Sequence, residues 1–138
     1  MCSSDLHLLQ EVSSRIDKQK DEGGLLARLG GDEFVVVGRE YENKSECRIK
    51  AVAKAKNILT SLKESYNVDL HSLYISASIG VSLIDGKNND ANRLIKEADI
   101  AMYEAKAKGR DGIIVFDDAM QKRVEHNLEI EQLLHFAL

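Results

Sequence analysis

The sequence predicts an α+β domain, an α/β sandwich in which helices flank one sheet. Two apolar runs, 25–29 and 34–37, lie on either side of a glycine pair and predict a tight β-hairpin. Two stretches with apolar residues at helical spacing, 45–66 and 90–109, alternate with shorter runs that favour strands. At 138 residues, of which 43% are hydrophobic, the chain has the size of one domain with its own core.

The charge and composition argue against several classes of protein. A formal net charge of −4 and a pI near 5.6 argue against a nucleic-acid binder that works by bulk electrostatics. No apolar run approaches the length of a membrane span, and residues 1–10 lack the pattern of a signal peptide. The two cysteines, Cys2 and Cys47, cannot build a disulfide framework and fit a reducing cytoplasm, which is the expected location.

Capping residues and apolar spacing predict the first elements. Ser3 or Ser4 can cap a helix that continues through Ile16, with Asp5 in its first turn. The charged stretch 17–24 ends in a glycine pair, which predicts a loop. The hairpin follows directly.

The second half of the chain alternates between helix and strand patterns. The stretch 45–66 has apolar residues on one helical face and lysines on the other. The run 73–84 is rich in β-branched and small residues and predicts one long buried strand. Asp90 can cap a third helix that Gly109 ends, and a short strand, 112–116, follows.

The turn of the hairpin carries the strongest chemical signal. Gly30 and Gly31 tolerate positive φ and leave no side chain in the way, so another molecule can approach the backbone closely. Asp32 and Glu33 follow at once, and carboxylate oxygens are ligands that Mg²⁺ prefers beside bound phosphate. The turn therefore predicts a metal–nucleotide site. For an arbitrary Gly-Gly-Asp sequence, a solvated acidic turn in an ordinary hairpin would be the favoured interpretation.

The stretch Gly30-Gly31-Asp32-Glu33-Phe34 spells the signature of the GGDEF family in full, and the chain resembles a diguanylate cyclase domain. The strand pattern 76–81 and the helix pattern 98–110 are also similar to the family, the latter almost throughout. The first predicted helix resembles a family helix that begins with a Gly-Asp pair, although Ser4 replaces the glycine. The similarity runs from about Asp5 to Phe116.

The resemblance implies a sheet flanked by helices that is related to the catalytic cores of adenylyl cyclases and polymerases. The family condenses two GTP molecules into cyclic di-GMP and releases pyrophosphate. Each subunit of a homodimer holds one GTP, with Mg²⁺ or Mn²⁺ as the implied cofactor. Catalysis of this kind consists largely of positioning and of neutralising phosphate charge.

The resemblance also implies roles for the turn residues. Asp32 would ligate the metal, and Glu33 beside it would help to activate the attacking hydroxyl. Gly30 and Gly31 would let the backbone lie against the phosphates.

Three further residues are implied at the nucleotide. Lys106 and Arg110 would hold the terminal phosphates, and Asp5 would accept hydrogen bonds from the guanine edge. From charge alone, Lys106 and Arg110 could instead be cations that complement a helix macrodipole, an effect worth about 0.3–1 kcal/mol each.

The sequence departs from the family pattern in two places that matter. The family's first strand, with a second metal-binding aspartate, and the turn after it, with an asparagine that reads guanine, have no counterpart. The chain alone is therefore expected to be an inactive, N-terminally truncated domain whose sheet lacks its first strand. The product-inhibition motif Arg-x-x-Asp is replaced by residues 21–24, which read Asp-Glu-Gly-Gly.

The predicted organisation is a partial GGDEF domain over residues 1–117 and a C-terminal linker helix over residues 118–138. The second segment is similar to the linker that joins GGDEF domains to a downstream EAL phosphodiesterase domain. A plain amphipathic tail explains the same pattern equally well.

Three functions remain open at this point. The first is a catalytic domain of a diguanylate cyclase, which the intact Asp32–Glu33 pair favours. The second is a regulatory module that binds GTP and controls a fused EAL phosphodiesterase. The third is a nucleotidyl transferase of polymerase or adenylyl cyclase type, because one fold supports several chemistries.

Overall fold

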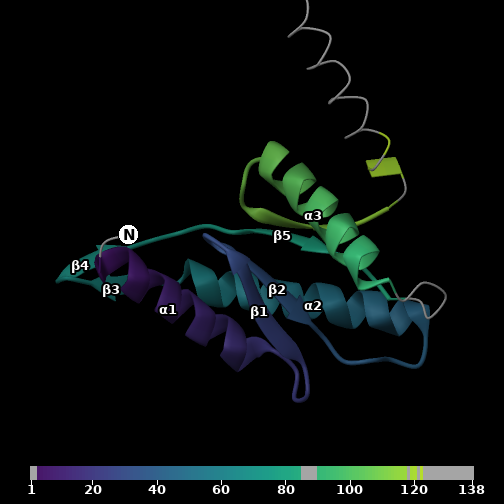
Figure 1. The fold of residues 1–138 in the computed structure, drawn as a ribbon, viewed down its shortest axis with the longest axis horizontal. Coiled ribbons are helices and arrows are strands. Elements are labelled where there is room, and N and C mark those ends of the chain that lie inside the picture. The colour runs from purple at the N-terminus through teal and green to yellow at the C-terminus, as the bar shows by residue number, and fades with distance from the viewer. Residues whose placement is uncertain (1–2, 85–89, 118, 121, 123–138) are drawn as a thin grey trace, which may run out of the picture.

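The computed structural model describes residues 3–84, 90–117, 119–120 and 122, and Figure 1 shows their arrangement. The linker helix expected over 118–138 and the turn expected over 85–89 lie almost wholly outside the described residues. The elements, in chain order, are α1 Ser3–Gln19, β1 Leu25–Gly30, β2 Glu33–Val37, α2 Lys44–Lys63, β3 Tyr66–Val68, β4 His71–Leu73, β5 Ser78–Val81, α3 Ala91–Ala107 and β6 Gly112–Val115.

The helix ends follow from side chains that satisfy backbone groups. Asn43 caps α2 by accepting a hydrogen bond from the Glu46 amide at 2.7 Å. Asp90 caps α3 as the sequence predicts, accepting from the Asn92 amide at 3.1 Å. Gly109 follows Lys108, the C-cap residue of α3. Its φ is 130°, a backbone conformation that residues with a side chain rarely adopt. The predicted start and end of α3 are therefore confirmed.

The predicted hairpin is also confirmed. β1 and β2 are antiparallel, with Leu25 opposite Val37 and Arg28 opposite Phe34. The register shifts between Arg28 and Gly30, so a bulge precedes the turn.

The predicted long strand over 73–84 is wrong. The chain instead forms the short hairpin β3–β4 and then, after a gap, the four-residue strand β5, which pairs in parallel with β6. Tyr66, predicted at the end of a helix, is the first residue of β3 and is only 1% exposed. Its hydroxyl donates to the Leu62 carbonyl at 2.8 Å. The composition of 73–84 predicts an extended backbone, but a strand forms only where a partner strand is in place to accept its hydrogen bonds.

The hairpin β1–β2 and the β5 segment pack on the same hydrophobic core. It is built from α1, α2 and β3, and side chains from both β1–β2 and the β5 segment pack on it. The buried cluster is Val12, Ile16, Ile58, Leu62, Tyr66 and Val68, and those packed against it include Leu26, Phe34, Val36, Ala77 and Ile79.

α3 covers β5 from the opposite side, at a glycine. Ile79 faces the α1–α2 core, so Gly80, the next residue, points the other way. A Cβ at Gly80 would collide with the Ala98 carbonyl oxygen and the Met102 nitrogen. The backbones of β5 and α3 are therefore in direct contact.

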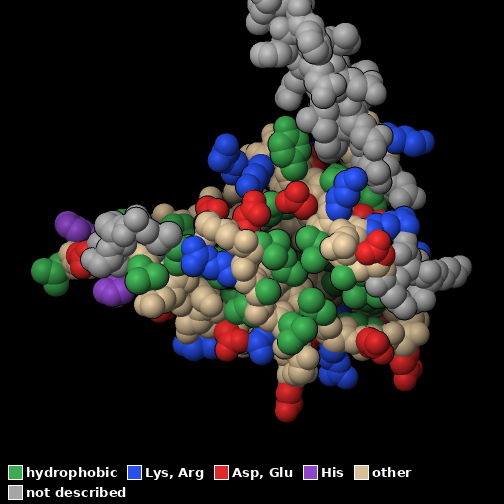
Figure 2. Space-filling view, viewed as in Figure 1, with side chains coloured by type: hydrophobic (Ala, Val, Ile, Leu, Met, Phe, Trp, Pro, Cys, Tyr) green, Lys and Arg blue, Asp and Glu red, His purple; other side chains and the backbone are tan. Residues whose placement is uncertain are grey.

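The strands form three separate pairs rather than the single predicted sheet, although the α+β class is confirmed. Among the described residues, β2 pairs only with β1, and β5 pairs only with β6. Both pairs nevertheless rest on one core. Figure 2 shows hydrophobic side chains gathered over the middle of this face, where Figure 1 places the hairpin and β5. Leu25 is 67% exposed and Leu29 56%.

Arg15 joins α1 to the end of α2. Its guanidinium donates to the carbonyl oxygens of Ser61 at 3.0 Å, Glu64 at 2.7 Å and Ser65 at 2.6 Å. It also stacks on the Tyr66 ring, 3.7 Å from the centroid. One side chain thus caps α2 and fixes where β3 begins.

None of the helices among the described residues combines the length and apolar character that a bilayer crossing requires.

We expect Gly80→Ala to lower the free energy of unfolding by more than about 1 kcal/mol, because the added methyl overpacks a backbone–backbone contact. Urea denaturation followed by circular dichroism measures the loss. Gly112→Ala in β6 is the matched control, since a Cβ there meets nothing within 4 Å. Equal stability of the two variants would contradict the close packing of α3 on β5.

Candidate functional site

The acidic turn is open on its outer side. Asp32 and Glu33 are exposed. Gly30 and Gly31 have φ of 150° and 51°, and a Cβ on either would meet nothing within 4 Å. The turn thus presents bare backbone and two carboxylates to solvent, an arrangement suited to close approach by a phosphate and a cation.

Arg28 fixes the turn from the strand side, a role that the sequence reasoning missed. Its Nε donates to the Gly31 carbonyl at 2.7 Å across the bulge. An arginine two residues before the glycine pair was the available signal.

The described residues contain no complete metal site. Within them, no group of three or more His, Cys, Asp or Glu side chains is placed to hold a metal ion. Asp32 and Glu33 offer hard oxygen donors, which fit Mg²⁺ or Mn²⁺ in kind. Mg²⁺ demands near-octahedral coordination, so the pair needs further oxygen ligands.

The two predicted phosphate-binding cations lie at the C-terminal end of α3. Lys106 is in the last turn and Arg110 follows Gly109, and both are exposed. Arg110 has a φ of 64°, and its amide donates to the Ala105 carbonyl at 3.2 Å. In the described part of the chain, no ion pair joins these cations to Asp32 or Glu33. Their position also fits macrodipole complementation, so both interpretations stay open.

Three element ends that carry predicted site residues point the same way. Asp5 lies in the first turn of α1. In Figure 1 the N-terminal end of α1, the turn end of the hairpin and the C-terminal end of α3 all point to the left. These three element ends therefore lie toward the same end of the fold.

The base of the hairpin, in contrast, is closed by Asp21. Its carboxylate accepts from the Arg39 amide at 3.2 Å and pairs with Lys54 of α2 at 3.1 Å. Its carbonyl accepts from the Gly24 amide at 2.9 Å. A Cβ at Gly24 would lie 2.7 Å from the Val37 carbonyl oxygen. Residues 21–24 therefore form a tight turn that joins the base of the β1–β2 hairpin to α2, and we call this turn the clasp.

Opposing effects act on the pKa of Asp21. Partial burial raises it, but the hydrogen bond and charge of Lys54 and the amide and charge of Arg39 outweigh the burial. The pKa of Asp21 therefore lies below its ordinary value of 3.8. The carboxylate is ionised at neutral pH and stabilises the clasp.

Comparison with known proteins identifies the chain's relatives. The family description "Diguanylate cyclase, GGDEF domain" matches residues 5–112. The bifunctional diguanylate cyclase/cyclic di-GMP phosphodiesterase MucR of Pseudomonas aeruginosa is 36% identical over 93% of the chain. The cyclic di-GMP phosphodiesterase PdeR of Escherichia coli is 37% identical over 95% of it. The chain spans only 18% of MucR and 19% of PdeR.

Solved structures agree. A structure of TpbB (YfiN) from Pseudomonas aeruginosa that comprises only the GGDEF domain superposes with a TM-score of 0.78 at 28% identity, covering 86% of this chain and 67% of that one. An EAL/GGDEF domain protein from M. capsulatus gives a TM-score of 0.68 at 28% identity, covering 80% and 68%. The sequence similarity and the fold point to the same domain.

The stability supplied by Asp21 should depend on pH with a definite sign. Since the folded pKa is depressed, the contribution is fully present above the ordinary value of 3.8 and is lost as pH falls through the lower folded value. We expect Asp21→Asn to be less stable than the natural chain at pH 7, with the difference shrinking below about pH 4. Thermal unfolding between pH 2.5 and 7 measures it. A difference that stays constant down to the lowest pH would contradict the ion pair.

Proposed function

The chain belongs to the GGDEF domain family of diguanylate cyclases, and from that premise we propose that a longer protein containing it condenses two GTP molecules into cyclic di-GMP and pyrophosphate. The observation that carries the proposal is the intact acidic pair on an exposed turn whose glycine backbone is open. The positive φ of both glycines would suit any tight turn, so the two exposed carboxylates beside this open backbone are what favour a metal–nucleotide role.

Each residue of the turn has its own role in the proposed reaction. Asp32 supplies a carboxylate to Mg²⁺ or Mn²⁺, which neutralises phosphate charge when bound. Glu33 lies next to it and accepts the proton of the attacking hydroxyl. Gly30 and Gly31 let the phosphates reach backbone N–H groups, and Arg28 holds the turn through its hydrogen bond to the Gly31 carbonyl.

The other nucleotide contacts come from helix ends. Lys106 and Arg110 bind the terminal phosphates, for which their exposure and positive charge are suited. Asp5, in the first turn of α1, accepts hydrogen bonds from guanine. Two such subunits, each with one GTP, are needed because each hydroxyl attacks the nucleotide of the other subunit. The cytoplasm, where GTP is available, is the proposed location.

A regulatory function is the second candidate. MucR and PdeR, both matched over more than nine tenths of the chain, are a bifunctional cyclase/phosphodiesterase and a phosphodiesterase. A domain that binds GTP without turnover could control an EAL phosphodiesterase domain in the same polypeptide. The intact Asp32–Glu33 pair favours the catalytic function over this one.

We expect Asp32→Ala to abolish conversion of GTP to cyclic di-GMP in a protein that joins this chain to the family's first strand. The loss should exceed a hundredfold, because the metal loses a ligand. The turn is exposed, so the thermal midpoint should stay within about 2 °C, the shift expected for a small stability change. Glu42→Ala, an exposed carboxylate outside the turn, is the control. Chromatography of nucleotides measures product, and full activity in Asp32→Ala would place the metal elsewhere.

Residues 1–138 alone should form no cyclic di-GMP from GTP with Mg²⁺ or Mn²⁺. Two carboxylates on one turn leave most of the coordination sphere of Mg²⁺ unfilled. The same chromatographic assay decides, with GTP binding followed by calorimetry as a second measurement. Robust turnover would show that the carboxylates of the turn suffice to bind the metal. Tight GTP binding without product, in the longer protein as well, would support the regulatory function instead.

A further inference from the structure

The β3–β4 hairpin lies at one end of the fold and carries exposed apolar side chains. Figure 1 places β3 and β4 at this end, and Figure 2 shows hydrophobic and histidine side chains there. Leu70, in the turn, is fully exposed, Tyr74 is 75% exposed and Leu73 is 40% exposed. Large apolar side chains that gather in this way on a surface indicate an interaction site.

The turn of this hairpin holds Leu70 in a conformation that leucine rarely adopts. The two central residues, Asp69 and Leu70, have φ of 49° and 68°. Glycine, asparagine and aspartate tolerate this left-handed conformation, whereas the Cβ of other residues disfavours it. The geometry of the turn therefore does not explain a leucine at position 70, and what this side chain adds is exposed apolar surface.

β4 also has a free edge. Among the described residues it pairs with β3 alone, and all three of its residues are exposed. Val68 and His71 lie opposite each other and close the two-residue turn. Backbone groups alternate between the two edges of an antiparallel strand, so those of His71 face β3 and those of Ser72 face the free edge.

We infer that two copies of this chain associate through this edge, with their β4 strands antiparallel about a two-fold axis beside Ser72. Ser72 of one copy then lies opposite Ser72 of the other, and the two exchange main-chain hydrogen bonds. In the same register Leu70 lies opposite Tyr74 of the other copy, and His71 lies opposite Leu73. The two most exposed apolar side chains of the hairpin thus cover each other, and no like charges lie opposite.

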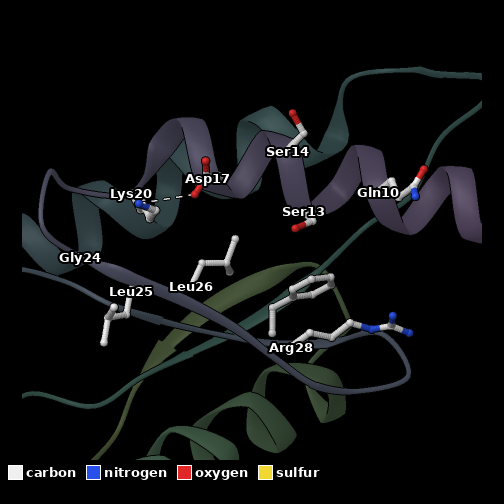
Figure 3. A pocket seen from close by; sticks show the side chains of 10 residues that line it. Gln10, Ser13, Ser14, Asp17, Lys20, Gly24, Leu25, Leu26 and Arg28 are labelled. Carbon is white, nitrogen blue, oxygen red and sulfur yellow. Dashed lines mark ion pairs between the residues drawn. The ribbon is translucent and has the colours of Figure 1, made fainter.

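A head-to-tail contact between copies fits the described surface less well. The groove between α1 and the β1–β2 hairpin, shown in Figure 3, is the place where a side chain of another copy could insert. Its α1 wall carries Gln10, Ser13 and Ser14. A leucine seated there would cover amide and hydroxyl groups without offering them hydrogen bonds. The two-fold contact instead sets each apolar patch against an identical one.

The size of the contact sets its strength. A covered tyrosine side chain buries roughly 150–250 Å². The tyrosines and leucines of both copies together therefore bury an area near the lower limit of specific interfaces, about 1,200 Å². We expect a weak, reversible dimer. The inference goes beyond the proposed function, because the interface needs neither GTP nor a metal ion and does not include the acidic turn.

Sedimentation equilibrium without nucleotide or metal measures the association. We expect a monomer–dimer equilibrium whose dissociation constant rises about tenfold or more in Leu70→Asn, because burial of a leucine is lost. Asparagine tolerates the positive φ, so urea denaturation should show a monomer at least as stable as that of the natural chain. Ile49→Asn, at an exposed apolar position of α2, is the matched control and should leave the constant unchanged.

A cross-link tests the register of the two strands. In a chain that carries Cys2→Ser and Cys47→Ser, the further change Ser72→Cys puts thiols on two residues whose Cα atoms lie about 5.5 Å apart in the dimer. This separation lies within the range that a disulfide spans. On mild oxidation Ser72→Cys should cross-link about tenfold faster than Asn67→Cys, which is exposed on β3 at the other edge of the hairpin.

Three results would overturn the inference: a monomer at millimolar concentration, a Leu70→Asn chain that dimerises as tightly as the natural one, or an Asn67→Cys chain that cross-links as fast as Ser72→Cys. None of these results would affect the proposed reaction, since they are obtained without GTP.

Discussion

The described fold depends first on Arg15, because its one guanidinium donates to three carbonyl groups at and just beyond the C-terminal end of α2, those of Ser61, Glu64 and Ser65. Hydrogen bonds from a charged donor contribute about 1.5–3 kcal/mol each, and the side chain is only 13% exposed, so solvent screens them weakly. Its stacking on Tyr66 directs the chain out of the helix and into β3. α1 is thereby fixed beside α2, and the core side chains of both helices form one surface on which the strand pairs rest.

The hairpin that carries the acidic turn is tied to the rest of the fold at its base and is open to solvent at its tip. At its base, Asp21 ties the strands to Lys54, and Gly24 leaves no space for a side chain. At its tip, Asp32 and Glu33 are exposed, a Cβ on either glycine would meet nothing within 4 Å, and Arg28 donates to the Gly31 carbonyl. A fixed base and an open tip suit a turn that must present donors and ligands to a partner molecule.

The described residues keep the layers of the family fold although their strands pair only two by two. β1–β2 and β5 lie on one core, and α3 covers β5 at Gly80, so the layers of the GGDEF fold are present. The hydrogen-bonded ladder between β2 and β5 is not formed in the described residues. Packing of side chains on the helices thus positions β1–β2 and β5 without backbone hydrogen bonds between these two parts of the described chain.

The sequence alone determined the features that depend on local geometry. The hairpin, the Asp90 cap and the Gly109 terminus follow from residues whose backbone preference or side chain acts within a few positions. The acidic turn was recognised because its signature is contiguous. Three features were decided only by the tertiary structure: Tyr66 begins a strand and does not end the helix, the stretch 73–84 does not form one long strand, and Asp21 joins the hairpin to α2. Each of them depends on a partner from a distant segment of the chain.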